Sequence, residues 1–205
     1  MAFLSDTGKA ALSEAISAVE DRSIAELVVI VRPSSGDYRA NDLLVGFVVA
    51  LASAAFMLFA PPEFGLMLIL LGPAVVVAIV VSLLRALPGL RALFVGEARQ
   101  RDAVLQAAQA CFFAKGIANT QGRTGVLIFA SVFERRVVVL ADSGVLAAID
   151  EPTWTQACRA IERILEDEGD ALVLAERITA LAPLLAAACP RGEHDVDELA
   201  NEVEG

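Results

Sequence analysis

Histidine and cysteine are scarce in this sequence, and each shortage excludes a class of chemistry. The single histidine, His194, lies in an acidic C-terminal stretch, so Ser-His-Asp and Cys-His catalytic arrangements have no suitable base. The three cysteines, Cys111, Cys158 and Cys189, form no Cys-x-x-Cys pair and stand in apolar, helix-like stretches. This pattern indicates free thiols in a reducing compartment rather than disulfides or a zinc site.

Positive charge is also in short supply, with 16 Lys and Arg against 26 Asp and Glu and a net charge of -10. This balance excludes a nucleic-acid partner, because a phosphate backbone is bound by a concentrated basic surface. About half of the net charge lies in residues 190–205, which contain six acids and one Arg. Residues 191–205 are therefore predicted to be a solvated acidic tail, and the alternative is a tail that docks on another protein.

Apolar residues are abundant: 57% of the chain is hydrophobic, and the mean hydropathy is +0.64. Between residues 43 and 84 the only charged residue is Glu63. Two apolar arms, 43–60 and 65–84, contain 18 and 20 residues. As helices they would span roughly 27 to 30 Å, the thickness of the hydrocarbon layer. Neither arm has the polar stripe of a core helix, so we expect a transmembrane hairpin over 43–84 rather than two buried core helices. The turn is expected at Pro61–Phe64.

The flanks of this hairpin predict its orientation. The connecting turn contains no Lys or Arg, whereas arginines precede and follow the two arms: Arg32, Arg39, Arg85, Arg91, Arg99 and Arg101. The positive-inside rule then places both termini in the cytoplasm. The first fifteen residues are too polar, and have an acid too early, for a signal peptide.

The remaining residues, 1–42 and 85–190, read as one α/β domain in two parts. A helix with Ala15 and Val19 on its buried face precedes an apolar strand over 26–32. After the hairpin we expect the following elements: a helix over 97–115, strands over 125–130 and 136–141 joined by a turn, and helices over 150–168 and 171–189. The crossover predicts that the first two strands are parallel, and the turn predicts an antiparallel third strand. Both strands of this pair are continuously apolar, so both are expected to be central. The fold class is a small α/β sandwich with a mixed sheet and an inserted transmembrane hairpin.

Three stretches resemble one known family. They are residues 15–37, residues 112–125 and, most specifically, GVLIFASVFERRVVVLADSGV at 125–145. Together they resemble the TPM domain, in its short membrane-anchored bacterial branch. The resemblance implies an α/β/α sandwich and a location in the bacterial inner membrane. Some relatives bind divalent metals through acids at the rim of the sheet, and a plant relative has been assigned acid phosphatase activity. Where many metal-associated members have paired aspartates this sequence has Phe133-Glu134.

Four acids are the candidates for holding a hard cation such as Ca²⁺ or Mg²⁺, which needs several oxygen ligands. They are Glu134 at the turn, Asp142 after the following strand, Asp150 at a helix start, and Asp37. A straight strand separates Glu134 from Asp142 by roughly 25 Å, so these two cannot share one metal. Asp142, Asp150 and Asp37 form the set that could converge at one rim.

These acids also have a purely structural interpretation. Glu134 would be a solvated turn acid paired with Arg135 or Arg136, and Asp142 would cap the turn that follows it. On this interpretation the protein is a non-enzymatic interaction or accessory module for other membrane proteins. The alternative function is a divalent-metal-dependent phosphohydrolase that uses the rim carboxylates.

Overall fold

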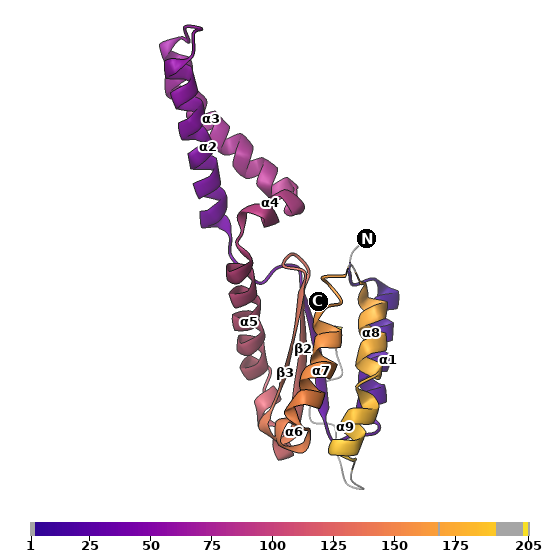
Figure 1. Ribbon diagram of the computed structural model, residues 1–205. Helices are drawn as coiled ribbons and strands as arrows, with labels where there is room; N and C mark the ends of the chain where they lie inside the picture. Colours follow the sequence, from indigo (N-terminus) through magenta and orange to yellow (C-terminus); the bar gives the residue numbers. More distant parts are fainter. Residues whose placement is uncertain (1–2, 168, 192–202, 205) are drawn as a thin grey trace. The chain divides into compact units, whose positions relative to one another are not determined.

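The computed structural model describes residues 3–167, 169–191 and 203–204. The chain divides into two compact units, which are described separately. One unit comprises Met1–Ser35 with Arg101–Gly205, and the other comprises Gly36–Gln100. The first is a mixed α/β unit and the second is helical (Figure 1).

A small mixed sheet forms the centre of the α/β unit. Its strands are β1 (Glu26–Arg32), β2 (Gly125–Ser131), β3 (Arg136–Ala141) and the two-residue β4 (Val203–Glu204), in the order β3-β2-β1-β4. β1 and β2 are parallel and β2 and β3 are antiparallel, as the sequence predicts. β4 pairs in parallel with β1, so the interpretation of residues 191–205 as a solvated tail is wrong at these two residues. There Glu204 forms ion pairs with Lys115 and Arg32.

The prediction that both apolar strands of the β2–β3 pair are central is correct for β2 and wrong for β3. Every residue of β2 is buried, whereas burial along β3 alternates. β3 stands at the edge of the sheet, with β2 as its one neighbour among the described strands. A continuous apolar run indicates that both faces of a strand are covered by other parts of the protein, but it does not indicate whether the strand has one or two neighbouring strands.

Helices cover both faces of the sheet (Figure 1). The larger core lies on the side of α1 (Asp6–Glu20), α7 (Glu151–Glu162), α8 (Ala171–Thr179) and α9 (Ala182–Ala188). On the other face α5 (Glu97–Ala114) contributes Val104, Ala108 and Phe112 to a second core. Short helical segments complete the unit: η1 (Ile117–Asn119), η2 (Gln121–Arg123) and α6 (Ser143–Ala148).

Two of the predicted helices differ from those observed. Residues 171–189 form α8 and α9 rather than one helix, and Pro183 lies in the first turn of α9. A proline lacks the N–H that a continuous helix would need there, and it is tolerated where a helix begins. The helix predicted over 150–168 is the shorter α7.

The three cysteines are free thiols in the structure. Cys158 and Cys189 are buried, and Cys111 is half-buried.

The helical unit contains α2 (Arg39–Phe59), α3 (Leu66–Ala86) and the short α4 (Pro88–Phe94). α2 and α3 pack against each other as a hairpin. Gly46 of α2 is buried there, and a Cβ at this position would lie 3.3 Å from Val81 Cγ2. The small side of α2 therefore faces α3, which lets the two backbones approach closely.

Among the residues that the structure describes, three helical stretches are long and apolar enough to cross a membrane, and they differ in burial. In α2 17% and in α3 6% of the apolar window is buried, against 39% for residues 171–188. The last stretch places Leu174, Ile178 and Leu185 in the core of the α/β unit. Burial thus separates a core stretch from two helices whose apolar side chains point outward.

Candidate functional site

The carboxylate of Glu134 lies buried in the turn between β2 and β3, with a relative exposure of 4%. Its Oε1 accepts hydrogen bonds from Ser34 Oγ at 3.1 Å and from the Ser35 N–H at 3.0 Å. Ser131 Oγ donates to Oε2 at 2.5 Å. The expectation that Glu134 is a solvated turn acid is therefore wrong, since three donors of its own chain hold it inside the protein.

These bonds tie the turn to the segment that follows β1. The Ser35 and Ser131 hydroxyls lie 2.6 Å apart. The main chain continues the same connection, because the Val132 N–H donates to Arg32 O at 2.9 Å and the Phe133 N–H donates to Pro33 O at 3.0 Å. A carboxylate that accepts several hydrogen bonds in a buried place makes strong, charge-assisted bonds. The network therefore anchors the point at which the chain leaves the sheet.

Asp142 caps α6, in agreement with the structural interpretation. Its Oδ1 accepts from the Ser143 N–H at 2.6 Å, and its Oδ2 lies 2.8 Å from Arg123 Nε. Burial raises the pKa of Asp142, but the Arg123 and Ser143 hydrogen bonds and the Arg123 charge outweigh it, so the pKa lies below its ordinary value. Gly144 is required beside it, because a Cβ there would lie 2.1 Å from Gly122 O.

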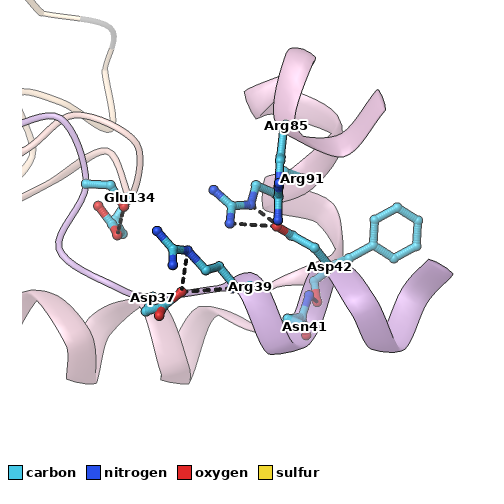
Figure 2. Close-up of polar contacts among 9 residues, drawn as sticks. Asp37, Arg39, Asn41, Asp42, Arg85, Arg91 and Glu134 are labelled. Atoms are coloured by element: carbon cyan, nitrogen blue, oxygen red, sulfur yellow. Dashed lines mark hydrogen bonds and ion pairs between the residues drawn. The ribbon is translucent and has the colours of Figure 1, made fainter. Parts of the chain in front are cut away.

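Asp150 and Asp37 lie at exposed positions, and both make local bonds. Asp150 Oδ2 caps α7 by accepting from the Thr153 N–H at 3.0 Å, and hydrogen bonding from Thr153 lowers the pKa of this carboxyl. Asp37 belongs to the helical unit, where its Oδ1 accepts from the Arg39 N–H at 3.0 Å (Figure 2).

Within the α/β unit, the structure does not assemble Glu134, Asp142 and Asp150 into one cluster. Glu134 and Asp142 flank opposite ends of β3, which pairs Arg136 with Ser131 and Ala141 with Val126. The six residues of β3, which lie between the two acids, alone extend about 20 Å along the strand. Over residues 3–167, 169–191 and 203–204, no group of three or more His, Cys, Asp and Glu side chains is arranged to hold a metal ion. Asp142 and Asp150 serve instead as helix caps.

A second polar cluster lies at the base of the hairpin, and the sequence analysis missed it. Asp42, in the first turn of α2, has no exposed surface. Its carboxylate accepts from Arg91 Nε at 2.9 Å and Nη2 at 2.8 Å, and Arg85 Nε lies 4.0 Å away (Figure 2). The Arg91 guanidinium also lies 5.5 Å from the centre of the Tyr38 ring.

This cluster fastens α4 to the start of α2. A bidentate Arg–carboxylate pair is directional as well as strong, and an acid in the first turn of a helix is favoured by the helix dipole. The Asn41 side chain adds a bond from Nδ2 to Phe94 O at 3.1 Å, at the end of α4. The signal in the sequence was a charge pattern, because Asp42 immediately precedes the apolar run while Arg85 and Arg91 follow it.

The structure thus defines a class of protein: an α/β domain whose first two strands are separated in sequence by an apolar helical hairpin. No family model and no curated protein matches this chain. The NMR structure of the BA42 protein from the psychrophilic bacterium Bizionia argentinensis is similar, with a TM-score of 0.60 and 17% sequence identity. The alignment covers 98% of this chain and 94% of that one. At this identity the likeness shows the fold alone.

Proposed function

We propose that this chain is a membrane-anchored TPM-domain protein of the bacterial inner membrane. Helices α2 and α3 cross the bilayer, and the α/β unit acts at the cytoplasmic face as an interaction or accessory module for other membrane proteins. The TPM assignment rests on residues 125–145, which form β2, the Glu134 turn, β3 and the start of α6.

The observation that carries the proposal is the outward apolar surface of α2 and α3. Side chains around both helices are more than half exposed, among them Phe47, Phe56, Leu70 and Ile79. A contiguous apolar surface of this kind is unfavourable in water, and hydrocarbon removes that cost. As helices, both segments make their main-chain hydrogen bonds internally, as a segment in lipid must, except at Pro73 of α3, which has no N–H to donate.

Topology and charge support the same orientation. β1 and β2 pair in register from Glu26 with Gly125 to Arg32 with Ser131, although the hairpin lies between them in sequence. Both ends of the hairpin must therefore return to one side of the bilayer, which two spans allow. Arg39, Arg85 and Arg91 stand at that end, and the turn at the other end carries Glu63 and no basic residue. The positive-inside rule makes the arginine-bearing side cytoplasmic.

Labelling with a membrane-impermeant maleimide tests this topology in intact cells with a permeabilised outer membrane. Glu63→Cys places a thiol in the turn and Glu176→Cys places one on the exposed side of α8, both in a Cys111→Ala background. We expect labelling of the first variant in intact cells and of the second only after lysis. Labelling of the Glu63→Cys variant only after lysis would contradict the proposal.

The role as an interaction module has its own experiment. The full chain is purified in mild detergent, and its thermal unfolding is measured with and without Ca²⁺ or Mg²⁺. We expect a specific membrane protein to co-purify and the unfolding temperature to be unchanged by either ion. A metal-dependent rise that Asp142→Asn or Asp150→Asn abolishes would contradict the module and favour the phosphohydrolase.

A further inference from the structure

The outer edge of β3 offers main-chain hydrogen-bonding groups with no strand beside them in the described part of the chain. The Asp142 N–H donates to Gly125 O at 2.9 Å, which sets the alternation of the antiparallel ladder. Every second residue of β3 therefore directs its N–H and C=O away from β2. These residues are Val137, Val139 and Ala141. An unpaired edge of this kind is a template for a further strand.

A groove of about 370 Å³ runs along this edge. Its floor is β3, where Val138 and Leu140 are half-buried on the face that α5 covers. Leu105 and Arg101 of α5 form one wall. The α5 side of the groove therefore offers the apolar side chains of Leu105, Val138 and Leu140 beside Arg101, and an added strand would place every second side chain there.

The other wall carries Glu162 and Glu166, and Arg136 also lines the groove. Glu166 pairs with Arg136 at 3.5 Å. Glu162 is half-buried, and it forms no hydrogen bond or ion pair with the described residues. Burial raises the pKa of the Glu162 carboxyl, Arg159 offsets this in part, and Glu166 adds to it. A cationic side chain beside Glu162 would relieve both effects.

We infer that the β3 edge binds an extended segment of a partner protein in which basic residues alternate with apolar ones. The segment adds to the sheet as a strand, with its apolar side chains on Val138, Leu140 and Leu105 and its basic side chains beside Glu162 and Glu166. Main-chain bonds supply affinity in this binding mode, and alternate side chains supply specificity. This inference rests on the proposed role as an interaction module and names the chemistry of its partner.

Two other occupants fit the groove less well. A second copy of β3 would bring the apolar Val137, Val139 and Ala141 to the side of Glu162, because its Arg136 alternates with Val138 and Leu140 onto the α5 side. The chain's own residues 190–205 contain six acids and one Arg, which is the wrong charge for that wall. The groove is thus complementary to a basic, alternating strand from another protein.

Peptide binding to the full chain in neutral detergent micelles tests the inference, with empty micelles as the baseline. The probe is a fluorescent six-residue peptide in which valine and lysine alternate, and binding is followed by anisotropy. The matched peptide has glutamate in place of lysine. A third peptide has the lysine-containing sequence with N-methyl groups on the edge that would face β3.

We expect the valine–lysine peptide to bind at least about tenfold more tightly than either control. Glu162→Gln should weaken it by about tenfold, and Glu162→Lys should reverse the preference toward the glutamate peptide. Glu176→Gln, on an exposed helix surface, should leave binding unchanged. Equal binding of the N-methylated peptide, no binding, or a dimer that the valine–lysine peptide does not dissociate would each overturn the inference. The labelling of Glu63→Cys does not depend on peptide binding. A wrong membrane topology can therefore be told apart from a β3 edge that binds no peptide.

Discussion

Single acidic residues in this protein accept hydrogen bonds that hold a turn or a helix end in place, and Glu134 is the clearest case. Its carboxylate accepts from Ser34, Ser35 and Ser131 in a buried place. Glu134→Gln would turn an amide NH₂ toward groups that themselves donate. We expect a loss of about 2 to 3 kcal/mol in the free energy of unfolding, measured by denaturant titration in detergent. The control, Glu176→Gln, lies on the exposed side of α8 and should change stability little. An equally small effect at Glu134 would show that the network does not hold the turn.

Asp142 should make stability depend on pH. Its pKa in the folded protein lies below the ordinary value of 3.8. Its contribution is therefore fully present above the unfolded pKa and is lost as the pH falls from about 4 through the folded pKa. Unfolding curves recorded from pH 6 downward should show this loss for the native chain and a smaller loss for Asp142→Asn. Curves of identical pH dependence would contradict the role of Arg123 and Ser143 in lowering this pKa.

At the scale of elements, the Asp42–Arg91 pair joins α4 to α2. Removing the carboxylate leaves Arg91, whose side chain is 20% exposed, without its bidentate partner. Breaking one half of a largely buried ion pair costs about 3 kcal/mol. Asp42→Asn should therefore lower the unfolding temperature in detergent and expose the α3–α4 connection to trypsin. Arg91→Lys keeps the positive charge but loses the bidentate guanidinium geometry, so we expect an intermediate effect. Unchanged proteolysis in both variants would contradict the role of the Asp42–Arg91 pair in joining α4 to α2.

The elements themselves were largely predictable from local pattern. Residues 43–84 combine the length of two spans with a Pro-Pro turn, and the observed helices α2 and α3 extend this range by only a few residues. The β1 and β2 strands follow from short apolar runs bounded by turn residues. The division of residues 171–189 into α8 and α9 was signalled by Pro183, but an apolar stretch rich in Ala and Leu hid it.

At the scale of the whole molecule, the α/β unit should fold without the hairpin. Its two cores are built from residues before 36 and after 100, and β1 pairs with β2 across the insertion. Residues 36–100 are replaced by a flexible Gly/Ser linker of about 20 residues, which spans roughly 25 Å. We expect a protein that is monodisperse without detergent and retains its circular dichroism. Aggregation of this protein while the full chain remains ordered in detergent would show that the hairpin is needed for folding.

Local sequence determined the two apolar helices, the charge asymmetry around them, the buried strands and the caps at Asp142 and Asp150, because each depends on neighbours within a few residues. Tertiary structure alone decided that β3 is an edge strand, that Glu134 is buried and that Asp42 pairs with Arg91. The partners of Glu134 at Ser34 and Ser35 lie 100 and 99 residues away in sequence, and Arg91 lies 49 residues from Asp42. Such contacts form only when distant parts of the chain meet in the folded protein, and the local hydrophobic periodicity of the sequence does not specify which residues will meet.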